Sequence, residues 1–167
     1  MFIRTPRLFL RPAWREDVLH LSRLLADSDV QRDLSGTPFL EIMADCDELL
    51  QPQRAPADVR LLIFQRTEET PRLIGAAGIG QPQGRHDFGL WLDPRHRRHG
   101  YALEAGKAVV ELAFDGLRID SLWCPALRQG SAARLVSRLG FRTSPQQQTL
   151  AVLEADCWSA PSTPMAA

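Results

Sequence analysis

The sequence predicts an α/β domain in which helices cover a mixed sheet. Apolar segments with the character of strands are separated by segments that repeat apolar residues at helical spacing. Their order is a strand, two helices, a meander of strands, and then strand, helix, strand, helix and strand. The 167 residues, 44% of them hydrophobic, are enough for one domain with its own core. We expect this domain to span residues 1–158, followed by a flexible tail over 159–167.

The first 58 residues are expected to form one strand and two helices. Residues 7–11 alternate apolar and polar side chains, as a half-buried strand does, and Pro12 ends them. Residues 36–38 break the chain between the helices, and residues 51–58 form a loop with two prolines. The apolar face is Val18, Leu21, Leu24 and Leu25 in the first helix, and Ile42, Cys46, Leu49 and Leu50 in the second.

The remaining elements alternate between strands and helices. Three strands separated by turns are expected at residues 59–65, 73–79 and 87–92, and the middle one is so apolar that both its faces should be buried. A long helix should run from Tyr101 to about Phe114. The later elements are a strand at 121–124, a helix at 132–139 ended by Gly140, a strand from Phe141, and a last strand at 149–153.

Charge and cysteine content argue against several classes of function. Lys and Arg number 20 and balance 20 Asp and Glu residues, so no strong field attracts nucleic acid or an anionic membrane. The 3 cysteines form no C-x-x-C pair, and the histidines have no partner at metal-ligand spacing, so we expect no metal. Such cysteines are typical of buried thiols in a reducing cytoplasm, and no apolar stretch is long enough to span a bilayer.

The most informative segment runs from residue 87 to 114. A strand leads into a basic loop over residues 95–99, and Gly100 then opens a helix. The first amides of a helix lack acceptors within it and carry partial positive charge, so a helix start binds anions. Gly100 lets the backbone approach a ligand closely, and Arg97 and Arg98 add full charges, so a pyrophosphate fits here. Taken alone, however, a basic loop before a helix is more often solvated surface.

The flanking residues make this pattern specific. Residues 97–102, Arg-Arg-His-Gly-Tyr-Ala, match the R/Q-x-x-G-x-G/A signature of the GCN5-related N-acetyltransferase (GNAT) superfamily. Residues 88–94 and 103–105 resemble the branch that acetylates ribosomal-protein N-termini at serine or alanine. The resemblance extends over almost the whole chain, because similar segments occur at residues 5–12, 134–141 and 149–158.

The resemblance implies a fold, a co-substrate and a set of binding residues. The fold is that of acyl-CoA N-acyltransferases, with a mostly antiparallel sheet in which a bulge splays one strand pair. The co-substrate is acetyl-CoA. Its pantetheine arm would pair with the backbones of Leu90 and Leu92, and Gln129 would orient the arm or the thiol. The pyrophosphate would be held by Arg97, Arg98, His99, Gly100, Tyr101 and Ala102.

Acetyl transfer requires a base that removes a proton from the acceptor amine. Asp87 is the candidate, because the branch often carries an acidic residue here, facing the acceptor cleft. The alternative is a solvent-facing turn carboxylate that pairs with Arg85 or His86. Trp91 is a candidate for the acceptor pocket because it lies on the splayed strand, although burial in the core is the commoner use of tryptophan.

The general acid of the branch is missing. The branch usually reads N-x-x-S-x-R at the start of the last helix, where this chain has Gln129 for the Asn and Ala132 for the Ser. Ala132 cannot donate a proton. Ser131 lies about 100° around the helix from that position and is more typical of an N-cap. Tyr101 is expected to pack against the cofactor instead of acting as an acid.

The sequence therefore predicts an N-acetyltransferase in which a primary amine attacks acetyl-CoA directly. The branch resemblance implies a protein N-terminus as acceptor and a possible homodimer, while a small amine or an amino sugar stays open. A rival hypothesis is a non-catalytic acyl-CoA-binding module with a regulatory or dimerising role. The loss of the usual serine at Ala132 favours that rival.

Overall fold

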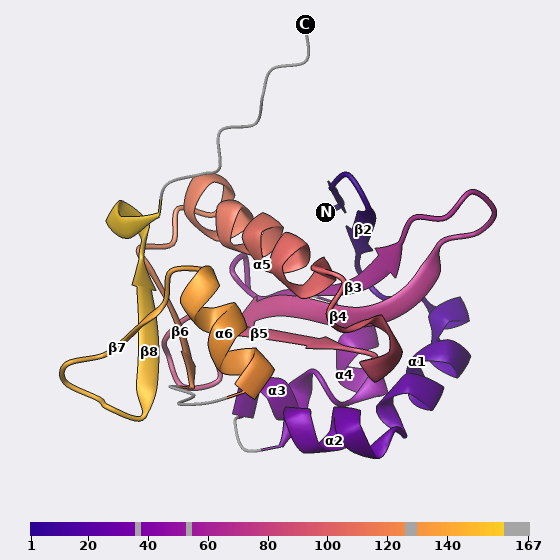
Figure 1. Cartoon of the computed structure of the whole chain (residues 1–167), viewed down its shortest axis with the longest axis horizontal. Helices are drawn as coiled ribbons and strands as arrows, with labels where there is room; N and C mark the ends of the chain where they lie inside the picture. Colours follow the sequence, from indigo (N-terminus) through magenta and orange to yellow (C-terminus); the bar gives the residue numbers. More distant parts are fainter. Residues whose placement is uncertain (36–37, 53–54, 126–129, 159–167) are drawn as a thin grey trace, which may run out of the picture.

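The fold is built on one eight-stranded sheet, seen in a computed structural model that describes residues 1–35, 38–52, 55–125 and 130–158. The strand order is β1-β2-β3-β4-β5-β6-β8-β7, and among the described strands only β5 and β6 pair in parallel (Figure 1). The mixed, mostly antiparallel sheet of the prediction is confirmed. The strands are β1 (Ile3–Arg4), β2 (Leu8–Arg11), β3 (Val59–Gln65), β4 (Arg72–Gly80), β5 (Asp87–Leu92), β6 (Ser121–Pro125), β7 (Arg142–Thr143) and β8 (Leu150–Glu154).

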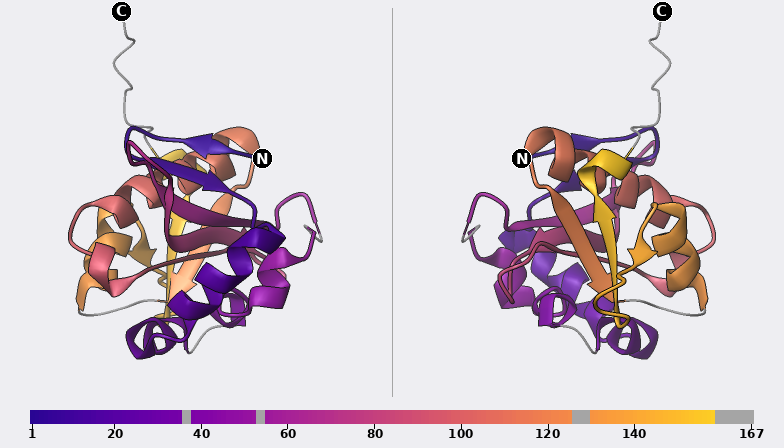
Figure 2. Two further views of the ribbon diagram at one scale, coloured as in Figure 1. Left: turned by 90° about the vertical axis from the view of Figure 1, so that its right-hand side faces the viewer. Right: turned by 90° about the vertical axis from the view of Figure 1, so that its left-hand side faces the viewer.

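Helices cover both faces of this sheet (Figure 2). On one face lie α5 (Tyr101–Glu111), which a π-helical turn extends over Leu112–Gly116, and α6 (Gly130–Arg138). On the other face lie four short helices from the first third of the chain: α1 (Val18–Leu25), α2 (Ser28–Leu34), α3 (Pro38–Ile42) and α4 (Cys46–Leu50). In the described ranges no helix is long and apolar enough to cross a membrane.

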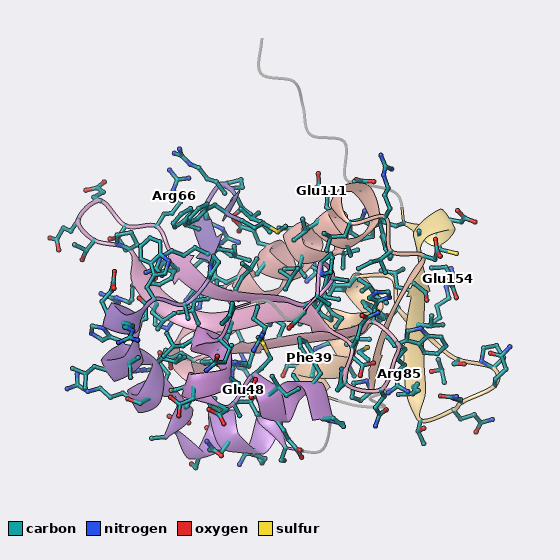
Figure 3. The ribbon with its side chains drawn as sticks, turned by 180° about the vertical axis from the view of Figure 1, so that it is seen from behind. Phe39, Glu48, Arg66, Arg85, Glu111 and Glu154 are labelled. Atoms are coloured by element: carbon teal, nitrogen blue, oxygen red, sulfur yellow. The ribbon has the colours of Figure 1, made fainter. Side chains whose placement is uncertain are left out.

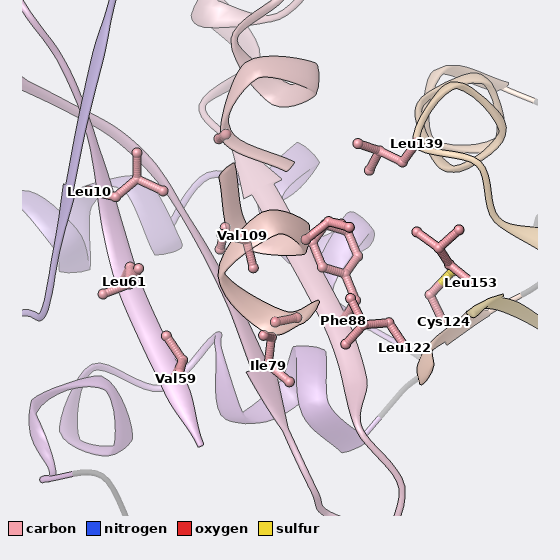
Figure 4. Close-up of a cluster of buried hydrophobic side chains, with 14 of the residues drawn as sticks. Leu10, Val59, Leu61, Ile79, Phe88, Val109, Leu122, Cys124, Leu139 and Leu153 are labelled. Atoms are coloured by element: carbon pink, nitrogen blue, oxygen red, sulfur yellow. The ribbon is translucent and has the colours of Figure 1, made fainter. Parts of the chain in front are cut away.

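The core has two layers because side chains alternate across the central strands. On β3, Leu61 and Ile63 point into the layer beneath α5, where Val109 packs (Figure 4). The intervening Leu62 and Phe64 point into the opposite layer with α1 to α4. Both faces of β3 and β4 are thus buried, which the sequence predicts for β4 only.

The region of α1 to α4 differs from the prediction. The second helix is not continuous: α3 ends at Ile42, and α4 starts after Asp45, whose carboxylate accepts hydrogen bonds from the amides of Asp47 and Glu48. An additional helix, α2, was not expected; Asp27 caps it through the amides of Asp29 and Val30. In both places an aspartate N-cap begins a new helix and interrupts the apolar periodicity.

From β3 onward the predicted elements agree closely with the structure. β3 and β5 have the predicted bounds, and Gly140 has the left-handed φ of 97° expected of a residue that ends a helix. The long helix begins at Tyr101 as predicted and continues as the π-helical turn past Glu111. The predicted tail over 159–167 lies outside the described residues.

A buried ion pair fixes the start of α1 against the sheet. Both terminal nitrogens of Arg11 donate to the Asp17 carboxylate, at 2.7 and 2.8 Å, and the side chains are 10% and 8% exposed. The Arg11 guanidinium lies over the rings of Trp14 and Phe64, at 3.8 and 4.3 Å from their centroids. The Trp14 amide also donates to Asp17, so the carboxylate joins β2 to the first turn, and the Arg11 guanidinium extends the contact to β3.

We predict that Asp17→Ala lowers the free energy of unfolding by about 3 kcal/mol, because it leaves the Arg11 guanidinium buried without a counter-charge. Urea denaturation followed by tryptophan fluorescence measures the change. Asp29→Ala, which breaks the exposed pair of Asp29 with Arg32, is the control and should cost less than about 1 kcal/mol. Equal effects of the two substitutions would contradict the prediction.

Candidate active site

The sheet opens between β5 and β6. These parallel neighbours share one aligned pair, Asp87 opposite Trp123, and beside it the Trp123 amide donates to the His86 carbonyl at 2.8 Å. The other edge of β6 pairs with β8 along its whole length, and beyond the pair of Asp87 with Trp123 β6 diverges from β5 (Figure 1). The splayed strand pair of the prediction is present. The bulge expected in β5 is not found in the described pairing. The register shift among the described strands lies between β3 and β4.

The free edge of β5 is formed by alternate residues. The His86 carbonyl points toward β6, whereas the Asp93 amide points toward β4 and donates to the Ile74 carbonyl at 2.8 Å. Since backbone groups alternate sides along a strand, Leu90 and Leu92 direct theirs into the opening. The Leu92 carbonyl accepts from the Arg97 guanidinium at 3.1 Å, so Leu90 and the Leu92 amide are the groups left to pair with an extended ligand.

The loop after β5 ends in a helix start with unused donors. Arg98 and Gly100 both have left-handed backbones, with φ of 64° and 82°, and Gly100 is the N-cap residue of α5 without a side chain to cap it. Within the described part of the chain, no acceptor contacts the amides of residues 98–103. These amides point their partial positive charge at the space beyond the helix, which is the requirement for binding an anion.

The predicted cationic side chains are divided between two places. The guanidinium of Arg97 is bonded to the Leu92 carbonyl and to Asp33 of α2, at 2.8 Å, so it faces away from the helix start. Arg98 and His99 are exposed beside it. The His99 ring stacks on Tyr101, whose hydroxyl accepts from Gln65 at 2.9 Å. The structure thus brings together every predicted pyrophosphate residue except the Arg97 side chain.

Asp87 stands where β5 and β6 part. Its side chain is only 9% exposed, and its carboxylate accepts a hydrogen bond from Arg85 Nε at 2.7 Å. Burial raises the pKa of Asp87 and outweighs the opposing effect of Arg85 and the smaller one of His86. Asp87 therefore pairs with Arg85, as the alternative of a turn carboxylate predicts. Its carboxylate is buried, however, whereas that alternative predicts that it faces solvent.

A cleft of about 270 Å³ opens beside Asp87. Figure 3 shows two of its residues, Phe39 of α3 and Arg85 of the turn between β4 and β5. Trp91 is not among the residues described around this cleft; it is buried in the layer of α1 to α4. The lining is Pro38, Phe39, Gln83, Arg85, Asp87, Phe88, Cys124, Pro125, Thr149 and Leu150.

Sequence reasoning missed most of this lining, including Phe39 and Cys124. Phe39 follows a predicted chain break, and nothing in the local pattern places α3 across from β5. Cys124 was expected to be a buried thiol, which it is, but its place beside Asp87 depends on the parallel pairing of β5 with β6. Burial, and then the nearby Asp87 charge, raise the pKa of Cys124 to about 12.

The start of α6 bears on the missing general acid. Gln129 lies outside the described residues. The helix begins at Gly130, so Ser131 is its second residue and not the preceding N-cap that we expected. Ser131 and Ala132 are both exposed.

A family model described as the acetyltransferase (GNAT) domain matches residues 7–142. The chain belongs to this family. It is also 25% identical over 143 residues to an uncharacterized N-acetyltransferase, p20, of Bacillus licheniformis, with 83% of this chain and 80% of the relative covered. This acetyltransferase thus carries the family's domain over most of its length.

Solved structures show the same fold. An acetyltransferase from Agrobacterium tumefaciens superposes with a TM-score of 0.72 at 25% identity, covering 91% of this chain and 92% of the other. A ribosomal-protein-S5-alanine acetyltransferase from Vibrio fischeri gives 0.69 at 11% identity, covering 95% and 99%. A spermidine N-acetyltransferase from Vibrio cholerae, solved with CoA and spermine, gives 0.69 at 14% identity, covering 92% and 98%.

The cysteines of this acetyltransferase should differ sharply in reactivity. With its pKa raised to about 12, the Cys124 thiol is ionised in only about one molecule in ten thousand at pH 8, whereas Cys157 is exposed. We predict that iodoacetamide modifies Cys157 and leaves Cys124 unmodified in the folded protein, as measured by peptide mass spectrometry. In urea all cysteines should react. Labelling of folded Cys124 at the rate of Cys157 would contradict the described burial.

Proposed function

We propose that this enzyme transfers the acetyl group of acetyl-CoA to a primary amine by direct attack. The observation that carries the proposal is the continuity of two features: the free edge of β5 leads, through residues 93–99, to the unbonded amides at the start of α5. One ligand that combines an extended amide-containing arm with a diphosphate matches both features.

The binding roles follow from this geometry. The backbones of Leu90 and Leu92 pair with the pantetheine arm. The amides of residues 98–103 hold the diphosphate, with Arg98, His99 and Tyr101 around it, and Gly100 and Ala102 leave room for its approach. These roles place the thioester toward the apex of the opening, near Asp87. Gln129, which lies outside the described residues, is proposed to orient the arm or the thiol.

Asp87 is proposed as the base. Its carboxylate accepts a proton from the acceptor ammonium, and the freed amine attacks the thioester carbon. A bond from nitrogen to carbon forms and the bond from carbon to sulfur breaks. The nitrogen gives its second proton to solvent, and the thiolate leaves and takes up a proton from solvent. The raised pKa of Asp87 suits this role because a carboxylate with a higher proton affinity is a stronger base.

The acceptor reaches Asp87 through the 270 Å³ cleft. Apolar residues line most of it, and its charged pair, Arg85 with Asp87, is neutral overall. We propose a protein N-terminus as acceptor, because such a substrate presents one amine at the tip of an otherwise uncharged backbone. The ribosomal-protein acetyltransferase among the structural neighbours supports this class, whereas the spermidine N-acetyltransferase keeps small polyamines as the second candidate.

The activity is tested by incubating the protein with acetyl-CoA and following the release of free thiol. The acceptors are N-terminal peptides beginning with serine or alanine, spermidine and an amino sugar. We expect thiol release with the peptides. Release with spermidine alone would show that the acceptor is a polyamine and not a protein N-terminus. Binding of acetyl-CoA without release on any acceptor would favour the non-catalytic module.

We predict that Asp87→Asn lowers kcat by about 100-fold or more, because it removes the base without changing the size of the side chain. In the wild-type protein kcat should rise with pH as Asp87 loses its proton, and burial moves the midpoint of this rise above the ordinary pKa of an aspartate. The variant should lack this rise. Asp115→Asn, at an exposed carboxylate, is the control. An unchanged pH profile in Asp87→Asn would contradict the role of Asp87.

We predict that Gly100→Val abolishes CoA binding. Valine adds a branched side chain where the backbone must approach the diphosphate, and it disfavours the left-handed φ of 82° at this residue. Isothermal titration calorimetry with CoA measures the loss. Circular dichroism checks that the protein stays folded. Gly84→Val is the matched control, since Gly84 also has a left-handed φ, of 76°, but lies in the turn before β5. Equal affinity in wild type and Gly100→Val would overturn the site.

A further inference from the structure

The segment between β1 and β2 is bonded to the first turn of α5 through one carboxylate. Thr5 Oγ1 donates to Glu104 at 2.6 Å, and the backbone amide of Arg7 donates to the same oxygen at 2.9 Å. The second carboxylate oxygen of Glu104 accepts from Arg7 Nε at 2.7 Å. Burial alone would raise the pKa of Glu104, but these hydrogen bonds together lower it, so the carboxylate stays charged. Three donors thus hold the segment between β1 and β2 against the first turn of α5.

These bonds fix the direction of the Arg7 guanidinium. Its Nη1 donates to the His99 carbonyl at 2.8 Å, and its carbon lies 4.7 Å from the centre of the Tyr101 ring. Its Nη2 lies 3.2 Å from the position that a side chain at Gly100 would occupy. In the described residues Nη2 has no acceptor, and the side chain is 49% exposed. One donor of Arg7 is therefore held unused at the mouth of the helix start.

We propose that Arg7 is a phosphate-binding residue of this acetyltransferase, with Nη2 donating to the diphosphate of CoA. The inference rests on the proposed function, since it adds a cation to the same site. It also supplies the charge that the sequence assigned to Arg97, whose guanidinium is bonded to Asp33 and the Leu92 carbonyl. Glu104 is a positioning residue, because it holds Arg7 and does not itself face the anion.

Two physical features make Arg7 suited to this role. A guanidinium that is already bonded through Nε and Nη1 loses little conformational freedom when Nη2 gains a third partner. The negative charge of Glu104 lies behind the guanidinium, and the partial positive charge of the helix start lies in front of it. An anion in front of Arg7 therefore meets the amides and the cation together.

The test is calorimetric titration with CoA and with 3′-dephospho-CoA, which keeps the diphosphate. Arg7→Ala should weaken binding of both ligands by about tenfold, the usual effect of losing one charge-assisted hydrogen bond. Arg4→Ala removes an exposed arginine three positions away, which has no ion pair among the described residues, and should leave both affinities unchanged. A penalty that disappears with 3′-dephospho-CoA would assign Arg7 to the 3′-phosphate and overturn the proposal for the diphosphate.

The positioning role of Glu104 is tested with Glu104→Gln and Arg7→Lys. Glu104→Gln should raise KM for acetyl-CoA and leave kcat at saturation unchanged, because the reacting atoms are distant from this segment. Arg7→Lys should recover only part of the affinity, since one ammonium cannot bond Glu104, His99 and a phosphate together. A fall in kcat with unchanged KM would contradict the role of Glu104. If the wild-type protein gives no heat with CoA, the proposed function fails. If the wild-type protein binds CoA and Arg7→Ala binds it equally well, the proposed function stands and this inference fails.

Discussion

The hydrogen bond from the Trp123 amide to the His86 carbonyl decides where this sheet closes and where it opens. It ties β6 to the residue just before β5, and β6, whose other edge pairs with β8 throughout, then diverges from β5 and leaves the rest of the β5 edge without a strand. An unpaired edge inside a sheet is costly unless another partner satisfies its backbone groups. Part of this need is met within the chain by the Arg97 guanidinium on the Leu92 carbonyl. The rest is available to an extended ligand.

The same opening determines the properties of Asp87. Because the parallel pairing stops beside it, the carboxylate lies at the boundary between the apolar interior and the cleft. Burial raises its pKa, while Arg85 gives it one hydrogen bond from the cleft side. Cys124 on the neighbouring strand shares this environment, and its thiol stays protonated. The end of the pairing between β5 and β6 thus explains both the raised pKa of Asp87 and the protonated thiol beside it in the cleft.

Local sequence patterns were sufficient where one physical effect dominates. β3, β5 and the start of α5 follow from apolar runs and from Gly100, and the structure has them at the predicted residues. The loop amides could also be placed, because they follow from the helix start itself. The helices α1 to α4 were less predictable, since Asp27 and Asp45 start new helices within an otherwise continuous apolar pattern.

Side-chain assignments in the site could not be made from local patterns, because they depend on contacts between distant segments. Arg97 lies in the signature, yet Asp33 of α2 binds its guanidinium, 64 positions earlier in the chain. Arg7 lies 97 positions before Glu104, in a segment for which the sequence predicts only a half-buried strand, yet it reaches the helix start. Which arginine presents its charge to the anion site therefore depends on which carboxylate its guanidinium pairs with. A guanidinium bonded along one edge by Glu104 keeps a free donor toward the site, whereas one shared between Asp33 and a carbonyl is drawn away from it.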